Sequence, residues 1–221
     1  MLDFEFVFAE KKQLRKSAVV LAGGSSSRFG QDKGLVDLSG KPLIRRVVDS
    51  LRPVVDEIIV VTCCQDRIKT YNVIVDSGVK YAIDERDSKG PLIGALTGFG
   101  VATGEYILLV PFDTPFISQK VALLLFELCV GRSAVIPRWP NGQIEPLHAV
   151  YRTEIALKAA RSAADSGRLD MRGMIERMPN VRFVSTLVIE QLDPKLESFF
   201  NVNTVVDLKK ARAIAKVSKV R

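Results

Sequence analysis

The sequence predicts an α/β fold, in which helices cover both faces of a mostly parallel sheet as a three-layer α/β/α sandwich. Short apolar runs alternate with helical patterns along most of the chain. The first two runs, residues 17–22 and 57–62, enclose a glycine-rich turn and one helix, an order that favours parallel pairing and a right-handed crossover. At 221 residues and 47% hydrophobic composition, the chain can bury such a core as one domain.

The first half of the chain contains four predicted strands. They cover residues 17–22, 57–62, 79–83 and 106–110. A helix over residues 41–54 has Pro42 near its start, where proline is favoured. Pro91 can open and Gly104 can close the next helix, residues 91–102. The fourth strand is almost wholly apolar, as a strand in the centre of a parallel sheet should be.

The second half of the chain continues the alternation. Ser118 can cap a helix over residues 119–130, which Gly131 ends. The other expected strands are residues 134–136, 147–151 and 181–185, and the other expected helices are residues 154–164, 171–177 and 205–215. No internal repeat or low-complexity linker is visible, so we expect one domain over residues 17–221, with residues 1–16 as an appendage.

Composition and charge argue against several classes of protein. The longest apolar runs are far shorter than the roughly 20 residues of a membrane helix, and the N-terminus lacks the order of a secretory signal. Cys63, Cys64 and Cys129 form no CxxC pair, which fits a reduced, cytoplasmic protein, and the single His148 argues against a Cys/His zinc site. The net charge of +7 favours an anionic partner. Because the basic residues are spread along the chain, a substrate with several phosphates explains this charge as well as nucleic acid does.

The segment LAGGSSSRFGQDK, residues 21–33, predicts a phosphate-binding loop. Its glycines remove the Cβ atoms that would keep a phosphate away from backbone N–H groups. Arg28 and Lys33 add a guanidinium fork and an ammonium group. The spacing matches neither GxxxxGK[ST] nor GxGxxG. An ordinary βα connection is the alternative, but such connections typically have about 2–6 residues, whereas eleven run from Gly23 to Lys33.

A carboxylate follows the apolar strand 106–110 in the segment PFDTP. Ligands of open α/β sheets bind beyond the carboxyl ends of the strands. Asp113 is therefore well placed to hold Mg²⁺, which takes few protein oxygens and adds substrate phosphates. The alternative is an aspartate that only caps the turn before Pro115.

Two asparagines, Asn201 and Asn203, stand just before the last predicted helix in the segment NVNT. A single asparagine there would most often be a helix N-cap. Two of them at positions i and i+2 suggest that these side chains do more than cap.

Together these segments resemble the MobA family, the molybdenum cofactor guanylyltransferases. The similar region extends from Val20 to about Leu208. Its motifs are LAGGSSSRFGQDK at 21–33, GKPLI at 40–44, GPLIG at 90–94, PFDTPFI at 111–117, PLHAVY at 146–151 and NVNT at 201–204. The resemblance implies a Rossmann-like fold of the nucleotide-diphospho-sugar transferase type. It also implies transfer of GMP from GTP to molybdopterin with release of pyrophosphate, dependent on Mg²⁺.

The resemblance further implies a role for each matching residue. Lys33, Arg28 and Asp113 would be catalytic, and Asp113 would also be the Mg²⁺ ligand. The residues implied to bind the substrates are Leu21, Ala22, Gly23, Gly24, Lys33, Asp84, Gly90, Gly94, Asn201 and Asn203.

The resemblance implies that Gly24, Arg28 and Lys33 would handle the GTP phosphates. Asp84 would lie near the nucleotide, with Gly90 and Gly94 shaping the wall beside it. Asn201 and Asn203 would face the metal or the pterin substrate. The two glycines of LAGG fit the guanylyltransferase branch. Transient contact with proteins of molybdenum cofactor biosynthesis, or with acceptor proteins, is a further implication.

The sequence leaves three alternatives open. A nucleotidyltransferase for another acceptor (CTP to molybdopterin, a sugar 1-phosphate or phospholactate) would share the fold and the metal site. A non-catalytic basic protein that binds nucleic acid would show steeply salt-dependent binding and release no pyrophosphate. A nucleotide-binding relative without activity is the third alternative, and the presence of Lys33 and Asp113 speaks against it.

Overall fold

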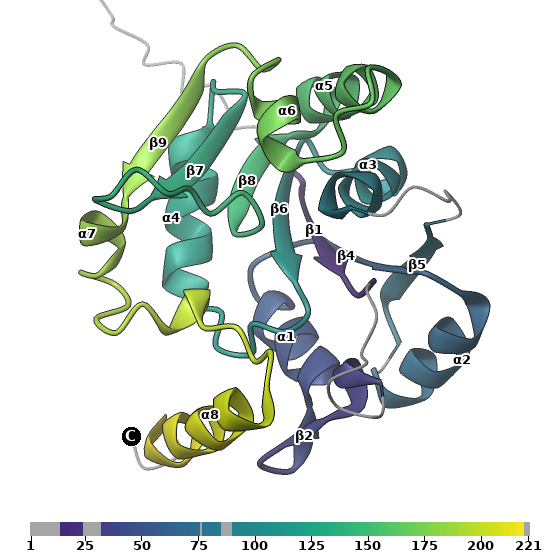
Figure 1. Ribbon diagram of the computed structural model, residues 1–221, viewed down its shortest axis with the longest axis vertical. Helices are drawn as coiled ribbons and strands as arrows, with labels where there is room; N and C mark the ends of the chain where they lie inside the picture. Colours follow the sequence, from purple (N-terminus) through teal and green to yellow (C-terminus); the bar gives the residue numbers. More distant parts are fainter. Residues whose placement is uncertain (1–13, 24–31, 76, 85–89, 219–221) are drawn as a thin grey trace, which may run out of the picture.

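The computed structural model describes residues 14–23, 32–75, 77–84 and 90–218 and shows a central sheet between two layers of helices (Figure 1). The sheet has seven strands in the order β5-β4-β1-β6-β8-β7-β9. These strands are β1 (Lys16–Leu21), β4 (Glu57–Thr62), β5 (Val79–Ile83), β6 (Tyr106–Pro111), β7 (Ala134–Arg138), β8 (Ala149–Arg152) and β9 (Val181–Ser185). The predicted α/β fold is confirmed.

Parallel pairing brings the ends of four strands to one edge of the sheet. β1 pairs in parallel with both β4 and β6, and β4 pairs in parallel with β5. The register places Leu21 beside Val61 and Pro111, and Thr62 beside Ile83. We call the edge at which these four strands end the carboxyl edge. β8 runs antiparallel to its neighbours β6 and β7, and β7 pairs in parallel with β9.

Helices cover the two faces of the sheet in separate layers (Figure 1). The helices of these layers are α1 (Leu43–Leu51), α2 (Gln65–Ile74), α3 (Pro91–Val101), α4 (Gln119–Cys129), α5 (Thr153–Asp165), α6 (Met171–Ile175) and α7 (Thr186–Ile189). The C-terminal helix α8 (Val205–Ser218) lies apart from them (Figure 1). Ala18 and Val20 of β1 pack with α1, α2 and α4 on one face, and Val19 packs with α3, α5 and α6 on the other. This alternation follows from the two-residue period of a strand and explains why the strands are apolar throughout.

A third apolar cluster joins the chain that follows the glycine-rich loop to the C-terminal helix. This part of the chain forms η1 (Lys33–Leu35) and the hairpin of β2 (Asp37–Leu38) and β3 (Lys41–Pro42), and it lies with α8 at the bottom of Figure 1. The cluster contains residues that follow η1, residues at the start of α1 and residues of α8. The buried Leu38 and Val202 belong to this cluster. Arg212 of α8 donates a hydrogen bond of 3.2 Å to the carbonyl of Asp37. The cluster therefore brings two segments from opposite ends of the sequence together.

The structure departs from the predicted elements at a few places, each with a local cause. The first helix begins at Leu43 rather than residue 41, because Lys41–Pro42 pairs with Asp37–Leu38. β1 begins one residue before the predicted strand, where Lys16 donates its N–H to the carboxylate of Asp56. The sequence did not reveal α2, whose single buried residue produces no apolar period. The helices α7, η1 and η2 (Glu197–Phe199) and the β2–β3 hairpin were also not predicted.

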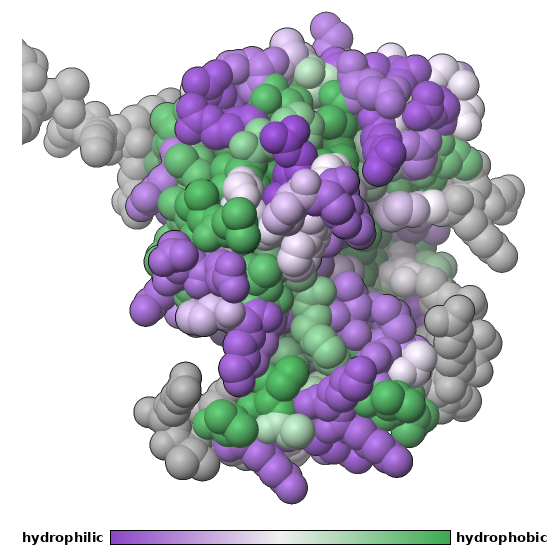
Figure 2. Space-filling model, turned by 60° about the vertical axis from the view of Figure 1, so that its left-hand side comes forward, coloured by the Kyte–Doolittle hydropathy of each residue, from purple (hydrophilic) through white to green (hydrophobic). Residues whose placement is uncertain are grey.

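The surface is mixed in polarity on the side of β9 and α7, which Figure 2 turns toward the viewer. Phe183, Leu187 and Val188 are exposed there, and the guanidinium of Arg138 lies 5.3 Å from the centre of the Phe183 ring. Green hydrophobic areas lie among purple hydrophilic ones on this face (Figure 2), and apolar atoms are an ordinary part of a water-exposed surface. In the described part of the chain, every helix is too short or too polar to cross a membrane.

Candidate functional site

Three segments that the sequence singles out meet at the side chain of Lys33. The Lys33 ammonium lies 2.5 Å from Oδ2 of Asp113 and 2.8 Å from Oδ1 of Asn203. Lys33 opens η1 after the glycine-rich loop, Asp113 follows β6, and Asn203 precedes α8. The side chains of Lys33 and Asp113 are only 11% and 15% exposed. The carboxyl edge therefore holds a mostly buried ammonium group between a carboxylate and an amide oxygen.

The backbone around Asp113 is tied to both neighbouring segments. Phe112 donates its N–H to the carbonyl of Leu21, at 3.1 Å, which anchors the turn to the end of β1. Val202 donates its N–H to the carbonyl of Asp113, at 2.9 Å, and its side chain is fully buried. The Phe112 ring also lies 5.5 Å from the Lys33 ammonium, within the range of a cation–π contact. The position of the Asp113 carboxylate is thus set by the fold on two sides.

The two asparagines have different environments. Thr204 and Asp207 form the capping pair of α8, in which Asp207 accepts the N–H groups of Asn203 and Thr204 at 3.0 and 2.8 Å. The side chain of Asn203 is therefore not needed as the cap and points to Lys33 instead. The amide of Asn201 donates to the carbonyl of Phe199, at 3.3 Å, and this hydrogen bond stays within its own segment. The structure brings Asn203, and not Asn201, to the Lys33 ammonium.

The second oxygen of Asp113 fits a metal ligand. Oδ1 of Asp113 is buried and has no hydrogen-bond partner among the residues that the structure describes. A buried carboxylate oxygen without a partner is costly, and a bound cation would remove that cost. Within the described ranges no three His, Cys, Asp or Glu side chains are grouped as a metal cluster. A Mg²⁺ ion at Asp113 would therefore complete its shell with water and substrate phosphates, which is this ion's usual preference.

Asp84 and Gly94 lie together beside the end of β1. Asp84 follows β5 and donates its N–H to the carbonyl of Thr62, at 2.8 Å. A Cβ on Gly94 would lie 3.2 Å from Cδ2 of Leu21 and 4.0 Å from Oδ2 of Asp84. Any side chain at position 94 would therefore intrude between α3 and the carboxyl edge.

Other loop and wall residues are placed less directly at the site. A Cβ on Gly90 would meet the carbonyl oxygen of Leu169 at 2.8 Å, so close backbone packing accounts for this glycine. Ala22 is buried and donates its N–H to the carbonyl of Val61. Gly23 is exposed. Gly24 and Arg28 lie outside the described residues.

Residues 18–181 match the family model of the MobA-like NTP transferase domain. The chain belongs to the MobA-like NTP transferase family. Two curated relatives are named probable molybdenum cofactor guanylyltransferases. The one from Methanosarcina mazei is 34% identical over 212 residues, which cover 94% of each chain. The one from Pyrococcus horikoshii is 35% identical over 196 residues, 86% of this chain and 96% of that one.

Solved structures show the same fold as this MobA-like transferase. Molybdopterin-guanine dinucleotide biosynthesis protein A from Archaeoglobus fulgidus superimposes with a TM-score of 0.77 at 26% identity, over 91% of this chain and 99% of that one. The 4-diphosphocytidyl-2C-methyl-D-erythritol synthase from Anaerococcus prevotii has a TM-score of 0.68 at 16% identity, over 92% and 96% of the chains, and shows the fold alone. The chain is a nucleotidyltransferase of the MobA-like family.

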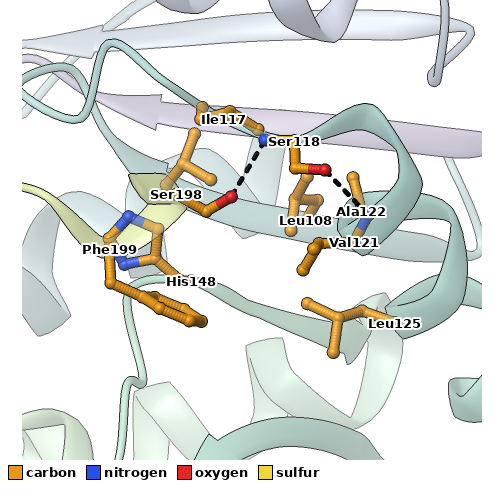
Figure 3. Close-up of a pocket in the computed structure, with 10 residues that line it drawn as sticks. Leu108, Ile117, Ser118, Val121, Ala122, Leu125, His148, Ser198 and Phe199 are labelled. Atoms are coloured by element: carbon orange, nitrogen blue, oxygen red, sulfur yellow. Dashed lines mark hydrogen bonds between the residues drawn. The ribbon is translucent and has the colours of Figure 1, made fainter. Parts of the chain in front are cut away.

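This MobA-like domain also contains a small cavity (Figure 3), and Lys33, Asp113 and Asn203 are not among the residues that line it. It measures about 20 Å³, enough for one water molecule, and lies between β6, α4 and η2. His148 lines it, with its ring centre 5.4 Å from that of Phe199. Ser198 Oγ accepts the N–H of Ser118, at 3.0 Å, and both residues also line the cavity. Burial lowers the pKa of His148 to about 3, so this imidazole is neutral at pH 7.

Sequence reasoning overlooked three residues near the ends of the glycine-rich loop in this MobA-like chain. Asp32 caps η1 and contacts Arg67 and Tyr71 of α2. Asp32 was visible within the LAGGSSSRFGQDK motif, where an aspartate directly before Lys33 could have been recognised as a cap. Arg67 and Tyr71 carry no such signal, because α2 itself has no apolar period.

Proposed function

We propose that this nucleotidyltransferase transfers GMP from GTP to molybdopterin and releases pyrophosphate, with Mg²⁺ as its metal. The observation that supports the chemistry best is the Lys33 ammonium held between Asp113 and Asn203 at the carboxyl edge. Ligands of open α/β sheets bind at this edge. The substrates are inferred from the relatives in Methanosarcina and Pyrococcus, both named as probable molybdenum cofactor guanylyltransferases.

The proposed reaction is an in-line phosphoryl substitution. A phosphate oxygen of molybdopterin attacks the α-phosphorus of GTP, and a new P–O bond forms. The bond from the α-phosphorus to the bridging oxygen breaks, and pyrophosphate leaves with the electron pair. A phosphate nucleophile is already anionic at pH 7, so the reaction needs no general base. The neutral, buried His148 is consistent with this, because it is not placed to act as one.

The residues of the chain would act by position and charge. Lys33 binds phosphate oxygens and offsets the negative charge that builds on the leaving pyrophosphate. Asn203 and Asp113 hold the ammonium in place before the substrate arrives, which lowers the cost of ordering it during the reaction. Asp113 would hold Mg²⁺ through Oδ1, and the bound ion supplies charge neutralisation on phosphate oxygens. Arg28 is proposed as a second cation on the phosphates, and Asp84 with Gly94 as the nucleotide wall.

A thermal-shift panel followed by a turnover assay tests this function. GTP, CTP, UTP and ATP are each added with Mg²⁺, and we expect GTP to raise the melting temperature most, because selective binding stabilises the folded state. We then expect GTP and molybdopterin together to release pyrophosphate. Stabilisation and turnover by CTP would instead assign the cytidylyl branch. Steeply salt-dependent nucleic-acid binding without pyrophosphate release would overturn the enzymatic proposal.

A further inference from the structure

Arg67 of α2 contacts both described ends of the connection between β1 and η1. Its Nη1 donates to the carbonyl of Ala22, at 3.0 Å, where the chain leaves the sheet. Its Nε lies 3.1 Å from Oδ2 of Asp32, where the described chain resumes. The side chains of Arg67 and Asp32 are 18% and 17% exposed, so water screens this pair only weakly. One guanidinium therefore fixes the separation between Ala22 and Asp32.

The other oxygen of Asp32 is also held by α2. Oδ1 accepts the hydroxyl of Tyr71, at 2.8 Å, and the N–H of Gly34, at 2.8 Å. Tyr71 follows Arg67 by four residues, so both side chains project from the same face of the helix. Tyr71 is fully buried, and a Cβ on Gly34 would collide with its hydroxyl. These contacts leave the Asp32 carboxylate a single orientation.

The orientation of Asp32 determines the position of the Lys33 backbone. Asp32 is the N-cap of η1, and Lys33 is the first residue of that short helix. Asp32 therefore holds the backbone of Lys33 in place. From this backbone position the Lys33 ammonium reaches Asp113 and Asn203. We infer that Arg67 is a positioning residue for phosphate binding, which holds Lys33 in place by joining Ala22 to Asp32. This inference rests on the proposed function, in which Lys33 binds phosphate oxygens.

The test measures phosphate affinity with a ligand that has neither base nor acceptor. The full-length chain is titrated calorimetrically with tripolyphosphate in the presence of Mg²⁺. We expect Arg67→Ala to weaken binding about tenfold or more, the loss that is usual when a residue that orients a metal-binding side chain is removed. Arg67→Lys should bind with an affinity between those of the wild type and Arg67→Ala, because an ammonium lacks the rigid planar fork with which the guanidinium contacts Ala22 and Asp32 at once. The matched control is Arg132→Ala, which removes a guanidinium bound to Asn180 near the start of β7, far from the carboxyl edge, and should bind normally.

The same titration separates positioning from a purely structural contribution. A structural contribution would lower the melting temperature or the number of binding sites per chain, but the folded fraction would keep the wild-type Kd. Wild-type affinity in Arg67→Ala, or equal weakening in Arg132→Ala, would overturn the inference. If Arg67→Ala does not fold, Arg67→Lys decides alone, because wild-type affinity in that variant would also overturn it.

Failure of the Arg67 inference can also be distinguished from failure of the proposed function. A wild-type chain that binds tripolyphosphate through Arg67, but releases no pyrophosphate from GTP and molybdopterin, would refute the function and leave the role of Arg67 standing. A wild-type chain that does not bind the probe would refute the phosphate site itself.

Discussion

The ammonium of Lys33 lies 2.5 Å from the carboxylate of Asp113, although 80 residues separate the two along the chain. Both groups are largely withdrawn from water, and taking two charges out of water costs free energy that their attraction only partly returns. Apolar residues of similar volume would stabilise the fold about as well. A pair of this kind therefore contributes more to placing charge at the carboxyl edge than to stability.

Replacing Asp113 should stop turnover and leave the fold intact. Asp113→Ala removes the carboxylate proposed to hold Mg²⁺, and we expect pyrophosphate release to be abolished. Circular dichroism should show wild-type secondary structure, because the turn is also held by the backbone bond from Val202. Mg²⁺-dependent activity near the wild-type level would refute the metal assignment.

Loss of the Lys33 ammonium should slow the reaction strongly. We expect Lys33→Ala to lower the turnover number by about a hundredfold or more, the usual cost of removing one charge stabiliser from a site that excludes water. Lys41→Ala is a matched control, because Lys41 is exposed and pairs with Asp49 of α1. Normal turnover in Lys33→Ala would show that the loop does not act as proposed.

The two asparagines of NVNT should respond differently to removal of their amides. Asn203→Ala takes away an acceptor of the Lys33 ammonium, whereas Asn201→Ala removes a bond to the carbonyl of Phe199. We expect Asn203→Ala to reduce kcat/KM about tenfold, the scale of a lost hydrogen bond to a charged group, and Asn201→Ala to reduce it less. Equal losses would instead show that Asn201 touches a substrate, as the family resemblance implies.

His148 should make the folded state less stable as the pH falls below its unfolded pKa. Burial lowers the pKa of His148 to about 3, while an unfolded histidine titrates near about 6.5. Between these values the unfolded chain binds the extra proton, so the free energy of unfolding should fall by up to roughly 1.4 kcal/mol per pH unit. His148→Phe should flatten this part of the urea-unfolding profile without loss of stability at pH 7, since neither ring nitrogen has a partner among the described residues. An unchanged slope would assign the titration to other groups.

Glu57 should add a second acid-sensitive contribution at lower pH. Burial alone would raise the pKa of this carboxyl, but hydrogen bonds from Lys80, Ser17 and Thr103 outweigh it and lower the pKa to about 2. The stabilisation is complete above the unfolded pKa of about 4.3 and is lost as the pH falls toward 2. Glu57→Gln should reduce this acid-dependent loss in the free energy of unfolding, measured by urea unfolding. Because Glu57 opens β4, at the opposite end of the strand from the carboxyl edge, we expect its turnover at pH 7 to match the wild type.

Much of the candidate site could be predicted because its signals are local. The glycine-rich loop before Lys33, the strand that ends before Asp113 and the paired asparagines before the last helix are each contained in a few consecutive residues. Parallel strands share a carboxyl edge, so the topology predicted from the strand–helix alternation was enough to place these segments on one side of the sheet.

Other parts of the site could not be predicted, because they depend on contacts between distant segments. Arg67 stands 35 residues after Asp32 on a helix without an apolar period, so no sequence pattern links the two. The sequence treats Asn201 and Asn203 alike, and only the path of the backbone beside Asp113 turns Asn203 toward Lys33. The GPLIG motif predicts Gly90 as part of the nucleotide wall, yet the backbone of Gly90 packs against Leu169.

The sequence by itself determined the α/β class, the order of the seven strands of the central sheet along the chain, and the carboxylate and ammonium suited to phosphate chemistry. These features follow from hydrophobic periodicity and turn-forming residues, whose effects extend over a few neighbours. The tertiary structure alone decided that Lys33 meets Asp113 and Asn203, and that Arg67 holds the ends of the loop. Those contacts depend on strand register and on packing between elements far apart in the chain, which no local pattern encodes.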